Sequence, residues 1–289
     1  MCNLNVCPIC KNTNLLILPN YNKSYLVKCS NCGFVFSNQL PTEIQVKSIY
    51  DAYGRNDYLS EITIKRYNEL LDSFEKYRKT NNLLDVGCGV GYFLDIAKKR
   101  GWNVYGTEFS ENAVSICAEK GIKMSLGVLT ADSFPQIQFD VVTAFEVVEH
   151  VSFPNEIITN MDYYVKKGGV IYLTTPNFNS LLRRYLKSKW DVIAYPEHLS
   201  YFTKSSLNSM MKQFGYKNIY LKTHGLSVSR LKKAKTGVKE KYISASSTDE
   251  KIRVSLEQNK LKLFVKKIIN YSLTVFALGD SLKALYIKK

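Results

Sequence analysis

The sequence predicts an α/β protein in which helices cover both faces of a parallel β-sheet and a small metal-binding module precedes the sheet. Two observations carry this prediction. Two Cys-x-x-Cys pairs stand within the first 32 residues, and short apolar runs alternate with amphipathic stretches from Asn81 onward. Of the 289 residues, 45% are hydrophobic and 22% are charged. This composition suffices for a sizeable core and excludes a disordered chain.

Cysteines define the N-terminal module. Five of the seven cysteines lie in the first 32 residues, and four of them form a Cys-x2-Cys-x18-Cys-x2-Cys pattern: Cys7, Cys10, Cys29 and Cys32. Each pair lets two sulfurs point at one ion, so the two pairs complete a closed tetrahedral zinc site that stabilises a fold. We therefore expect a zinc ribbon over residues 1–40, built from two short β-hairpins. Two disulfides are the alternative, which a cytosolic setting disfavours, and Cys2 could compete as a ligand.

Residues 41–80 are richer in polar and aromatic side chains and are expected to form a linker and a lid helix. The helical stretch runs from Ile62 to Tyr77. Tyr50, Tyr53 and Tyr58 precede it. These tyrosines could close over a bound cofactor, or they could pack the core of the ribbon.

The alternating elements begin at Asn81 and occupy residues 81–289. Apolar runs predict strands and 3.6-residue periodicity predicts helices. The expected strands are residues 83–86, 104–107, 140–144, 170–174, 219–222 and 284–287, and the expected helices are residues 92–99, 112–120, 155–165 and 204–214. Residues 232–278 are expected to be largely helical, which makes residues 227–280 a basic helical insertion before the last strand.

Positive charge is concentrated in the C-terminal part. The formal net charge is +15, and residues 227–289 hold 15 Lys and Arg against 5 Asp and Glu. Such a field attracts phosphates of RNA, lipid head groups or an anionic substrate. The helix expected at residues 260–278 could lie on an anionic membrane surface, or it could pack beside the sheet with its lysines outward.

No segment is expected to cross a membrane. The apolar stretch 268–278 is far shorter than the about 20 residues that a span requires. The N-terminus lacks the pattern of a secretory signal. We therefore expect a cytoplasmic protein. If it contacts a membrane at all, we expect peripheral contact at the inner membrane face.

A glycine-rich turn follows the first strand of the sheet. The run Asp85-Val86-Gly87-Cys88-Gly89-Val90-Gly91 lets the backbone turn sharply and approach a ligand. About 20 residues on, Glu108 ends the second strand, where a carboxylate can accept the hydroxyls of a ribose. A P-loop is absent, and the acid at position 85 would repel pyrophosphate but can hold an ammonium. An amino-acid tail joined to adenosine, as in S-adenosylmethionine, fits both features.

These motifs resemble those of class I S-adenosylmethionine-dependent methyltransferases, over roughly residues 80–225. The resemblance rests on residues 84–91, Glu108, residues 139–142 and residues 167–169. It implies a Rossmann-like, seven-stranded, mostly parallel sheet whose last strand is antiparallel. It also implies a cofactor site in which Gly87 and Gly89 pass under the methionine, Glu108 holds the ribose and Phe109 flanks the adenine. The other residues implied at this site are Asp85, Cys88, Gly91, Val128 and Phe145. Many relatives carry an acid where this chain has Val128, so the adenine contact there is expected to be backbone or apolar.

The second substrate is expected beside residues 145–151, Phe-Glu-Val-Val-Glu-His-Val. If this segment is helical, Glu146, Glu149 and His150 share one face. His150 could then act as a general base on an acceptor hydroxyl. Alternatively the three side chains, with His198, bind Mg²⁺, Mn²⁺ or Zn²⁺. This second pattern resembles the metal set of ubiquinone-pathway and small-RNA 2′-O-methyltransferases. A third possibility is that these side chains have a purely structural role. We also expect a structural role for His224.

The acceptor predicted by resemblance is a sugar or another small molecule. The ribbon, Tyr50 and Tyr53, and residues 175–177 and 197–202 are similar to methyltransferases of surface-polysaccharide and deoxysugar pathways, whose sugars are free, nucleotide-linked or lipid-linked. O-methylation is favoured over transfer to carbon. A ribosomal-RNA methyltransferase is the alternative, since some carry a zinc ribbon, but the aromatic and basic residues of the tail do not alternate as a base-stacking surface would. An inactive binding module is disfavoured by the intact glycine run and Glu108.

Overall fold

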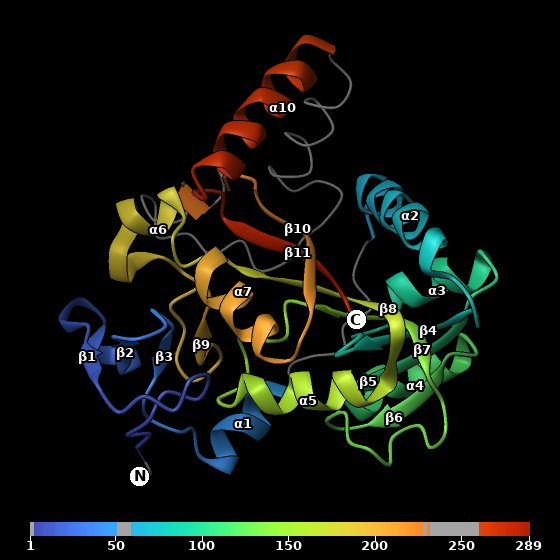
Figure 1. Cartoon of the computed structure of the whole chain (residues 1–289), viewed down its shortest axis with the longest axis horizontal. Helices are drawn as coiled ribbons and strands as arrows, with labels where there is room; N and C mark the ends of the chain where they lie inside the picture. Colours follow the sequence, from blue (N-terminus) through green and yellow to red (C-terminus); the bar gives the residue numbers. More distant parts are fainter. Residues whose placement is uncertain (1–2, 51–58, 228–229, 232–259) are drawn as a thin grey trace.

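The computed structural model describes residues 3–50, 59–227, 230–231 and 260–289. Its centre is a seven-stranded sheet with the order β10-β11-β8-β7-β4-β5-β6 (Figure 1). The strands are β4 (Asn82–Val86), β5 (Asn103–Glu108), β6 (Lys123–Leu126), β7 (Phe139–Phe145), β8 (Val165–Pro176), β10 (Lys217–His224) and β11 (Ser281–Ile287). Strands β4 to β8 are parallel, and β11 is antiparallel to both of its neighbours. The predicted seven-stranded, mostly parallel sheet is confirmed.

Helices cover both faces of this sheet, as predicted. Because successive strand residues point to opposite faces, Leu83 and Val141 lie in one buried cluster, and Leu84 and Val142 lie in another. The first cluster is covered by α2 (Glu61–Phe74) and α3 (Tyr92–Lys99). The second is covered by α5 (Pro154–Tyr164) and α7 (Lys204–Gln213). The other α-helices of the described residues are α1 (Glu43–Tyr50), α4 (Glu111–Glu119), α6 (Leu181–Leu186) and α10 (Lys260–Val275).

The N-terminal ribbon is a second, four-stranded antiparallel sheet with the order β1-β2-β3-β9. Its strands are β1 (Leu15–Ile17), β2 (Leu26–Cys29), β3 (Val35–Ser37) and β9 (Ser200–Tyr201). The two expected hairpins share β2. Strand β9 comes from the second half of the chain, and the Phe34 ring packs 5.0 Å from the Phe202 ring. The ribbon is therefore built into the same hydrophobic core as the large sheet.

Two local expectations were wrong. Residues 146–150 form a bend and a turn instead of a helix, and Glu146 has a φ of +52°. Strand β6 was not predicted, since its four residues are at least partly exposed and show little apolar patterning. Some expectations lie outside the described residues. These are the lid role of Tyr53 and Tyr58 and the helical structure of residues 232–259 in the basic insertion. Within the described parts of the chain, no helix is long and apolar enough to cross a membrane.

Candidate active site

The glycine loop lies between β4 and α3. Gly87, Gly89 and Gly91 have φ values of +67°, +55° and +74°, a region that favours glycine over other residues. The loop turns back on the end of β5, where the Cys88 N–H donates to the Thr107 carbonyl at 3.0 Å. A Cβ on Gly91 would lie 2.8 Å from the Cys117 sulfur, whereas nothing lies within 4 Å of a Cβ on Gly89. Gly89 therefore faces open space and Gly91 faces packed protein.

Glu108 joins the end of β5 to this loop. Its Oε2 accepts the Gly89 N–H at 2.9 Å, and its Oε1 accepts the N–H groups of Phe109 and Ser110 at 2.7 and 3.2 Å. Each carboxylate oxygen has about two acceptor positions, so these three bonds fix the carboxylate and leave acceptor capacity on Oε2. The side chain is thereby held beside Gly89, the open glycine of the loop.

Asp85 lies on β4 just before the loop and is buried. Thr143 on the adjacent strand β7 donates to its Oδ1 at 2.6 Å. Burial raises the pKa of the Asp85 carboxyl to about 8; the Thr143 hydrogen bond opposes this shift and the charge of Glu108 adds to it. A cation placed beside this carboxyl would favour its ionised form.

A short segment after β7 lies directly against the loop. A Cβ on Gly87 would lie 2.8 Å from the Val147 side chain, so Val147 and Gly87 are in close contact. The preceding Glu146 N–H donates to the Thr174 carbonyl at 3.0 Å and ends the strand pairing. The His150 N–H then donates to the Val147 carbonyl at 3.0 Å and closes a turn. Glu149 and His150 thus follow Val147, which contacts the loop, by two and three positions in the sequence.

Glu149, His150 and His198 form one cluster. A carboxylate oxygen of Glu149 and one nitrogen of each ring lie within 4.8 Å of one another. This trio contains three of the four predicted residues. Glu146 is not among them, and it does not share a helical face with Glu149 and His150, because residues 146–150 form a bend and a turn. His198 comes from a distant segment, which is fixed because the N–H groups of Leu199 and Ser200 donate to the Glu149 carbonyl at 2.8 and 2.9 Å.

Backbone carbonyls set the tautomer of both histidines. The His150 Nδ1 lies 2.8 Å from the Glu197 carbonyl oxygen, and the His198 Nδ1 lies 2.8 Å from the Val192 carbonyl oxygen. Because a carbonyl only accepts, each Nδ1 carries the hydrogen. In the neutral rings, each Nε2 therefore carries the lone pair that can take a proton or bind a metal ion.

Burial also sets the charge of the cluster. It lowers the pKa of both histidines, and the neighbouring His198 lowers the pKa of His150 further. Burial, and secondly the charge of Glu146, raise the pKa of Glu149 well above its ordinary value. Glu149 is only 2% exposed, and among the described residues its Oε2 has no hydrogen-bond partner. A buried carboxylate oxygen of this kind requires a proton or a cation.

The other predicted cofactor residues lie around the loop with different exposures. Phe109 and Val128 are 43% and 58% exposed. Phe145 is partly buried in an aromatic group, with its ring centroid 5.0 Å from Phe93 and 5.9 Å from Tyr67. Cys88 belongs to the loop itself and is half-buried, and its sulfur would lie 2.7 Å from a Cβ on Gly106 of β5.

The four N-terminal cysteines come together as predicted. Cys7 and Cys32 have sulfurs 3.6 Å apart, Cys10 and Cys29 have sulfurs 3.5 Å apart, and all four lie within 4.8 Å of one another. Sulfurs bound to zinc at about 2.3 Å in a tetrahedron are about 3.8 Å apart. The residues therefore fit a zinc ion.

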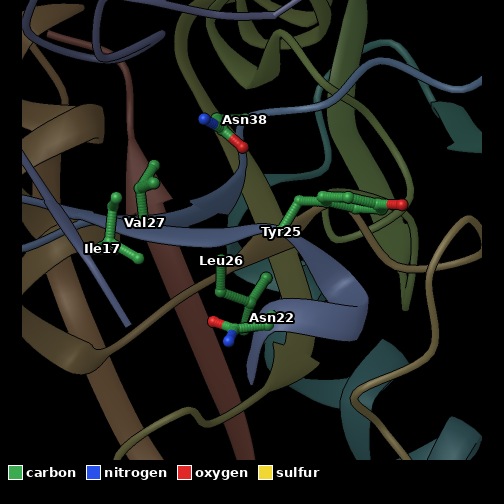
Figure 2. A pocket seen from close by; sticks show the side chains of 6 residues that line it. All are labelled: Ile17, Asn22, Tyr25, Leu26, Val27 and Asn38. Atoms are coloured by element: carbon green, nitrogen blue, oxygen red, sulfur yellow. The ribbon is translucent and has the colours of Figure 1, made fainter. Parts of the chain in front are cut away.

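A shallow hollow on the ribbon has no counterpart in the sequence predictions. It measures about 230 Å³ and is lined by Ile17, Asn22, Tyr25, Leu26, Val27 and Asn38 (Figure 2). No charged side chain lines it. Its residues come from β1, β2 and the segments beside them, and none of them belongs to the glycine loop or to the group Glu149, His150 and His198.

Three contributors to the site were missed by sequence reasoning. Thr143 was detectable, because it is paired with Asp85 in adjacent parallel strands. The carbonyls of Val192 and Glu197, which orient the two histidines, left no signal, since every residue has a carbonyl.

The strand order and the glycine loop after β4 define a class I methyltransferase fold. The chain belongs to the methyltransferase domain family, whose model matches residues 57–221, more than half of the chain. Solved structures agree in fold. A SAM-dependent methyltransferase from Archaeoglobus fulgidus is 17% identical with a TM-score of 0.53, over 86% of this chain and all of that one. The N-methyltransferase NodS from Bradyrhizobium japonicum, in complex with S-adenosylhomocysteine, is 12% identical with a TM-score of 0.50, over 84% and 97%.

Curated relatives include two enzymes named ubiquinone biosynthesis O-methyltransferase. The one from Pseudomonas aeruginosa is 35% identical over 104 residues, which are 34% of this chain and 45% of that enzyme. The one from Hydrogenovibrio crunogenus is 28% identical over 179 residues, 57% of this chain and 73% of that enzyme. The match therefore spans less than half of the Pseudomonas enzyme. Neither name comes from a polysaccharide pathway, so the resemblance to sugar methyltransferases gains no support from these two relatives.

Proposed function

We propose that this protein is an S-adenosylmethionine-dependent O-methyltransferase that acts on a hydroxyl of a small molecule. The observation that carries the proposal is the contact between Gly87 and Val147, which joins the glycine loop to the segment bearing Glu149 and His150. This contact supports a cofactor site that lies beside a set of proton-accepting groups. Methyl transfer to oxygen requires both, because the acceptor hydroxyl must lose its proton as it attacks.

The chain's own groups suit the cofactor's three parts. The carboxylate of Glu108, fixed by three N–H groups, keeps an acceptor position on Oε2 that suits a ribose hydroxyl. The buried Asp85 suits an ammonium group, and the partly exposed Phe109 and Val128 suit the edges of an adenine. When bound, S-adenosylmethionine supplies a methyl group on a positively charged sulfur. The protein's task is to hold the acceptor oxygen in line with that methyl and to exclude water.

His150 is proposed as the general base. Its Nδ1 hydrogen is committed to the Glu197 carbonyl, so its Nε2 is the atom that takes the proton. Burial keeps the ring neutral, which is the form a base requires. His198, with its ring centroid 4.6 Å from that of His150, lowers the pKa of His150 and keeps the ring oriented by edge-to-face packing.

A divalent cation is the second candidate for this cluster. It is favoured by the Glu149 Oε2, which is buried and has no hydrogen-bond partner among the described residues, and by the two imidazoles, each of which has a nitrogen within 4.8 Å of a Glu149 carboxylate oxygen. One carboxylate and two imidazoles suit Mn²⁺, Fe²⁺ or Zn²⁺ better than Mg²⁺, which prefers oxygen ligands. When bound, such an ion would acidify a coordinated hydroxyl. The same three residues would then hold the ion instead of the proton.

The four N-terminal cysteines are proposed to hold a structural zinc. Four thiolates leave no open position for chemistry. The ribbon would then help to hold His198 in position, because its strand β3 pairs with β9, which begins two residues after His198.

The proposal is tested first by cofactor binding and then by methyl transfer. Titration calorimetry with S-adenosylhomocysteine is expected to give saturable binding to the wild-type protein and binding at least ~10-fold weaker for Glu108→Gln, which loses one charged acceptor. Transfer of a labelled methyl group is then screened over phenolic acceptors, free and nucleotide-linked sugars, and ribosomal RNA. The ubiquinone enzymes among the relatives motivate the phenols, and the resemblance to sugar methyltransferases motivates the sugars. Absence of cofactor binding would refute the proposal. Labelling of RNA alone would show that the acceptor is RNA and not a small molecule.

A further inference from the structure

Helix α10 carries an exposed apolar stripe. Phe264 and Tyr271 are 60% and 73% exposed, and Val265, Ile268 and Val275 are also exposed. Phe264, Ile268, Tyr271 and Val275 are spaced by three and four residues, which places these four on one face of the helix. Figure 1 shows α10 extending away from the large sheet, with only its C-terminal end near β10 and α6.

The opposite face of α10 attaches the helix to the protein. Asn270 accepts the Gly225 N–H at 3.0 Å through its side chain, and Thr274 donates to the Thr223 carbonyl at 2.6 Å. Leu273 is buried between them. Each residue of an α-helix is rotated by about 100° from the one before. This rotation places the attached face on the side of the helix opposite Ile268 and Val275. The apolar stripe therefore points directly away from the body of the protein.

The charge of α10 identifies the kind of surface that the stripe fits. The helix contains four lysines and no acidic residue, and Lys267 is exposed beside the stripe. A helix with apolar and aromatic residues on one face and lysines around it is typical of segments that lie in the interface of an anionic bilayer.

Helix α6 lies next to the C-terminal end of α10 (Figure 1). The Leu181 N–H donates to the Leu278 carbonyl at 2.9 Å and holds the two elements together. Leu181 and Tyr185 are exposed on α6, and exposed cationic side chains accompany them: Arg184, Lys187 and Lys189. An interfacial helix alone binds a membrane weakly, and a second basic and aromatic element next to it strengthens the attachment.

We propose that α10 docks the protein onto the surface of an anionic lipid bilayer, with Phe264, Ile268, Tyr271 and Val275 inserted among the lipids and Lys267 beside them on the head groups. Two other occupants fit less well. A second copy of the chain would bring two lysine-rich helices together, with like charges opposed. A nucleic acid would match the lysines but leave the apolar stripe in water. The inference concerns where the protein is held, and it does not depend on the proposed reaction.

Vesicle flotation of the full-length protein tests this docking. We expect flotation with phosphatidylcholine vesicles that contain about 30% phosphatidylglycerol, and little flotation with phosphatidylcholine alone. The double variant Phe264→Asp/Ile268→Asp should reduce the bound fraction at least ~10-fold, because it places two charges in the apolar layer. Lys267→Glu should reduce binding at about 0.1 M salt more than at about 0.5 M, where screening removes the electrostatic part.

Ile44→Asp is the matched control. Ile44 is 82% exposed on α1, which lies at the far end of the molecule from α10 (Figure 1). This variant should float as the wild type does, and circular dichroism should show all variants folded. Three results would overturn the proposal: no flotation of the wild type with anionic vesicles, equal flotation of the Phe264→Asp/Ile268→Asp variant, or a wild-type dimer that only this variant converts to a monomer. Binding of RNA without binding of vesicles would assign the surface to nucleic acid instead.

Discussion

The rings of His150 and His198 meet edge to face, with centroids 4.6 Å apart and an interplanar angle of 74°. The two residues are far apart in the sequence, and each is oriented by a backbone carbonyl at 2.8 Å. Because each Nδ1 donates to a carbonyl, the acceptor nitrogen of each neutral ring is Nε2, which is the basis of the first prediction.

His150→Gln should abolish most of the activity and spare the cofactor site. Loss of a general base typically lowers kcat by ~10²–10⁴-fold, whereas S-adenosylhomocysteine affinity should change less than about twofold, since Glu108 and the loop are untouched. Because burial lowers the pKa of His150 from its ordinary value of 6.5, the base is neutral at pH 7. In the wild type, kcat/KM should therefore begin to fall only below pH 6.5. His224→Gln, at the end of β10, serves as the control, and equal losses in the two variants would contradict the prediction.

Gly89 and Gly91 should separate binding from stability. Both have positive φ, so alanine costs about 1 kcal/mol at either position. Gly91→Ala also drives a Cβ to 2.7 Å from Ile122 and 2.8 Å from Cys117, and should lower the free energy of unfolding by roughly 2–4 kcal/mol in all. Gly89→Ala meets no protein atom, yet it should weaken S-adenosylhomocysteine binding at least ~10-fold by occupying the cofactor's space. Urea denaturation and calorimetry measure the two effects, and unchanged affinity in Gly89→Ala would place the cofactor elsewhere.

Asp85 should release a proton when the cofactor binds. With a pKa raised to about 8 by burial, its carboxyl is mostly protonated at pH 7 in the protein without ligand. The ammonium of S-adenosylhomocysteine favours the ionised form, so it lowers this pKa and the proton leaves. Calorimetry at pH 7 in two buffers with different ionisation enthalpies should give different heats. The difference should shrink above about pH 9, where the carboxyl is already ionised, and should be absent in Asp85→Asn. Identical heats in both buffers for the wild type would exclude a role of Asp85 next to the ammonium.

Zinc removal should disturb the reaction centre as well as the ribbon. Cys10→Ser is expected to lose the metal and roughly 3–5 kcal/mol of stability, lowering Tm by about 10 °C. Because β3 pairs with β9 just after His198, kcat should fall more than cofactor affinity. Metal analysis, thermal melts and kinetics provide the measurements. Cys88→Ser, a thiol outside the cluster, should retain about one zinc per chain; a metal-free wild type with the same Tm would refute the assignment.

Features that depend on residues close together in the sequence were predicted well, and features that depend on long-range contacts were not. Helix α3 was predicted with the bounds that the structure shows, because glycine at its start and regular apolar spacing define it within ten residues. The cysteine cluster was predicted from spacing alone. In contrast, the helix over residues 146–150 was wrong, since the backbone of Glu146 has a left-handed conformation and donates to Thr174. His198 was assigned to the cluster by residue type, but the pairing of β9 that brings it there is a long-range contact without a local signal.

Strand β11, residues 281–287, is the last strand of the large sheet in sequence, but in space it lies between β10 and β8. During synthesis on the ribosome, the neighbours on either side therefore emerge before the strand that joins them. Until then each presents an open edge, to which other nascent chains can add. A stop codon a few residues before position 281 would make that state permanent, so aggregation is the expected fate of such a truncated product.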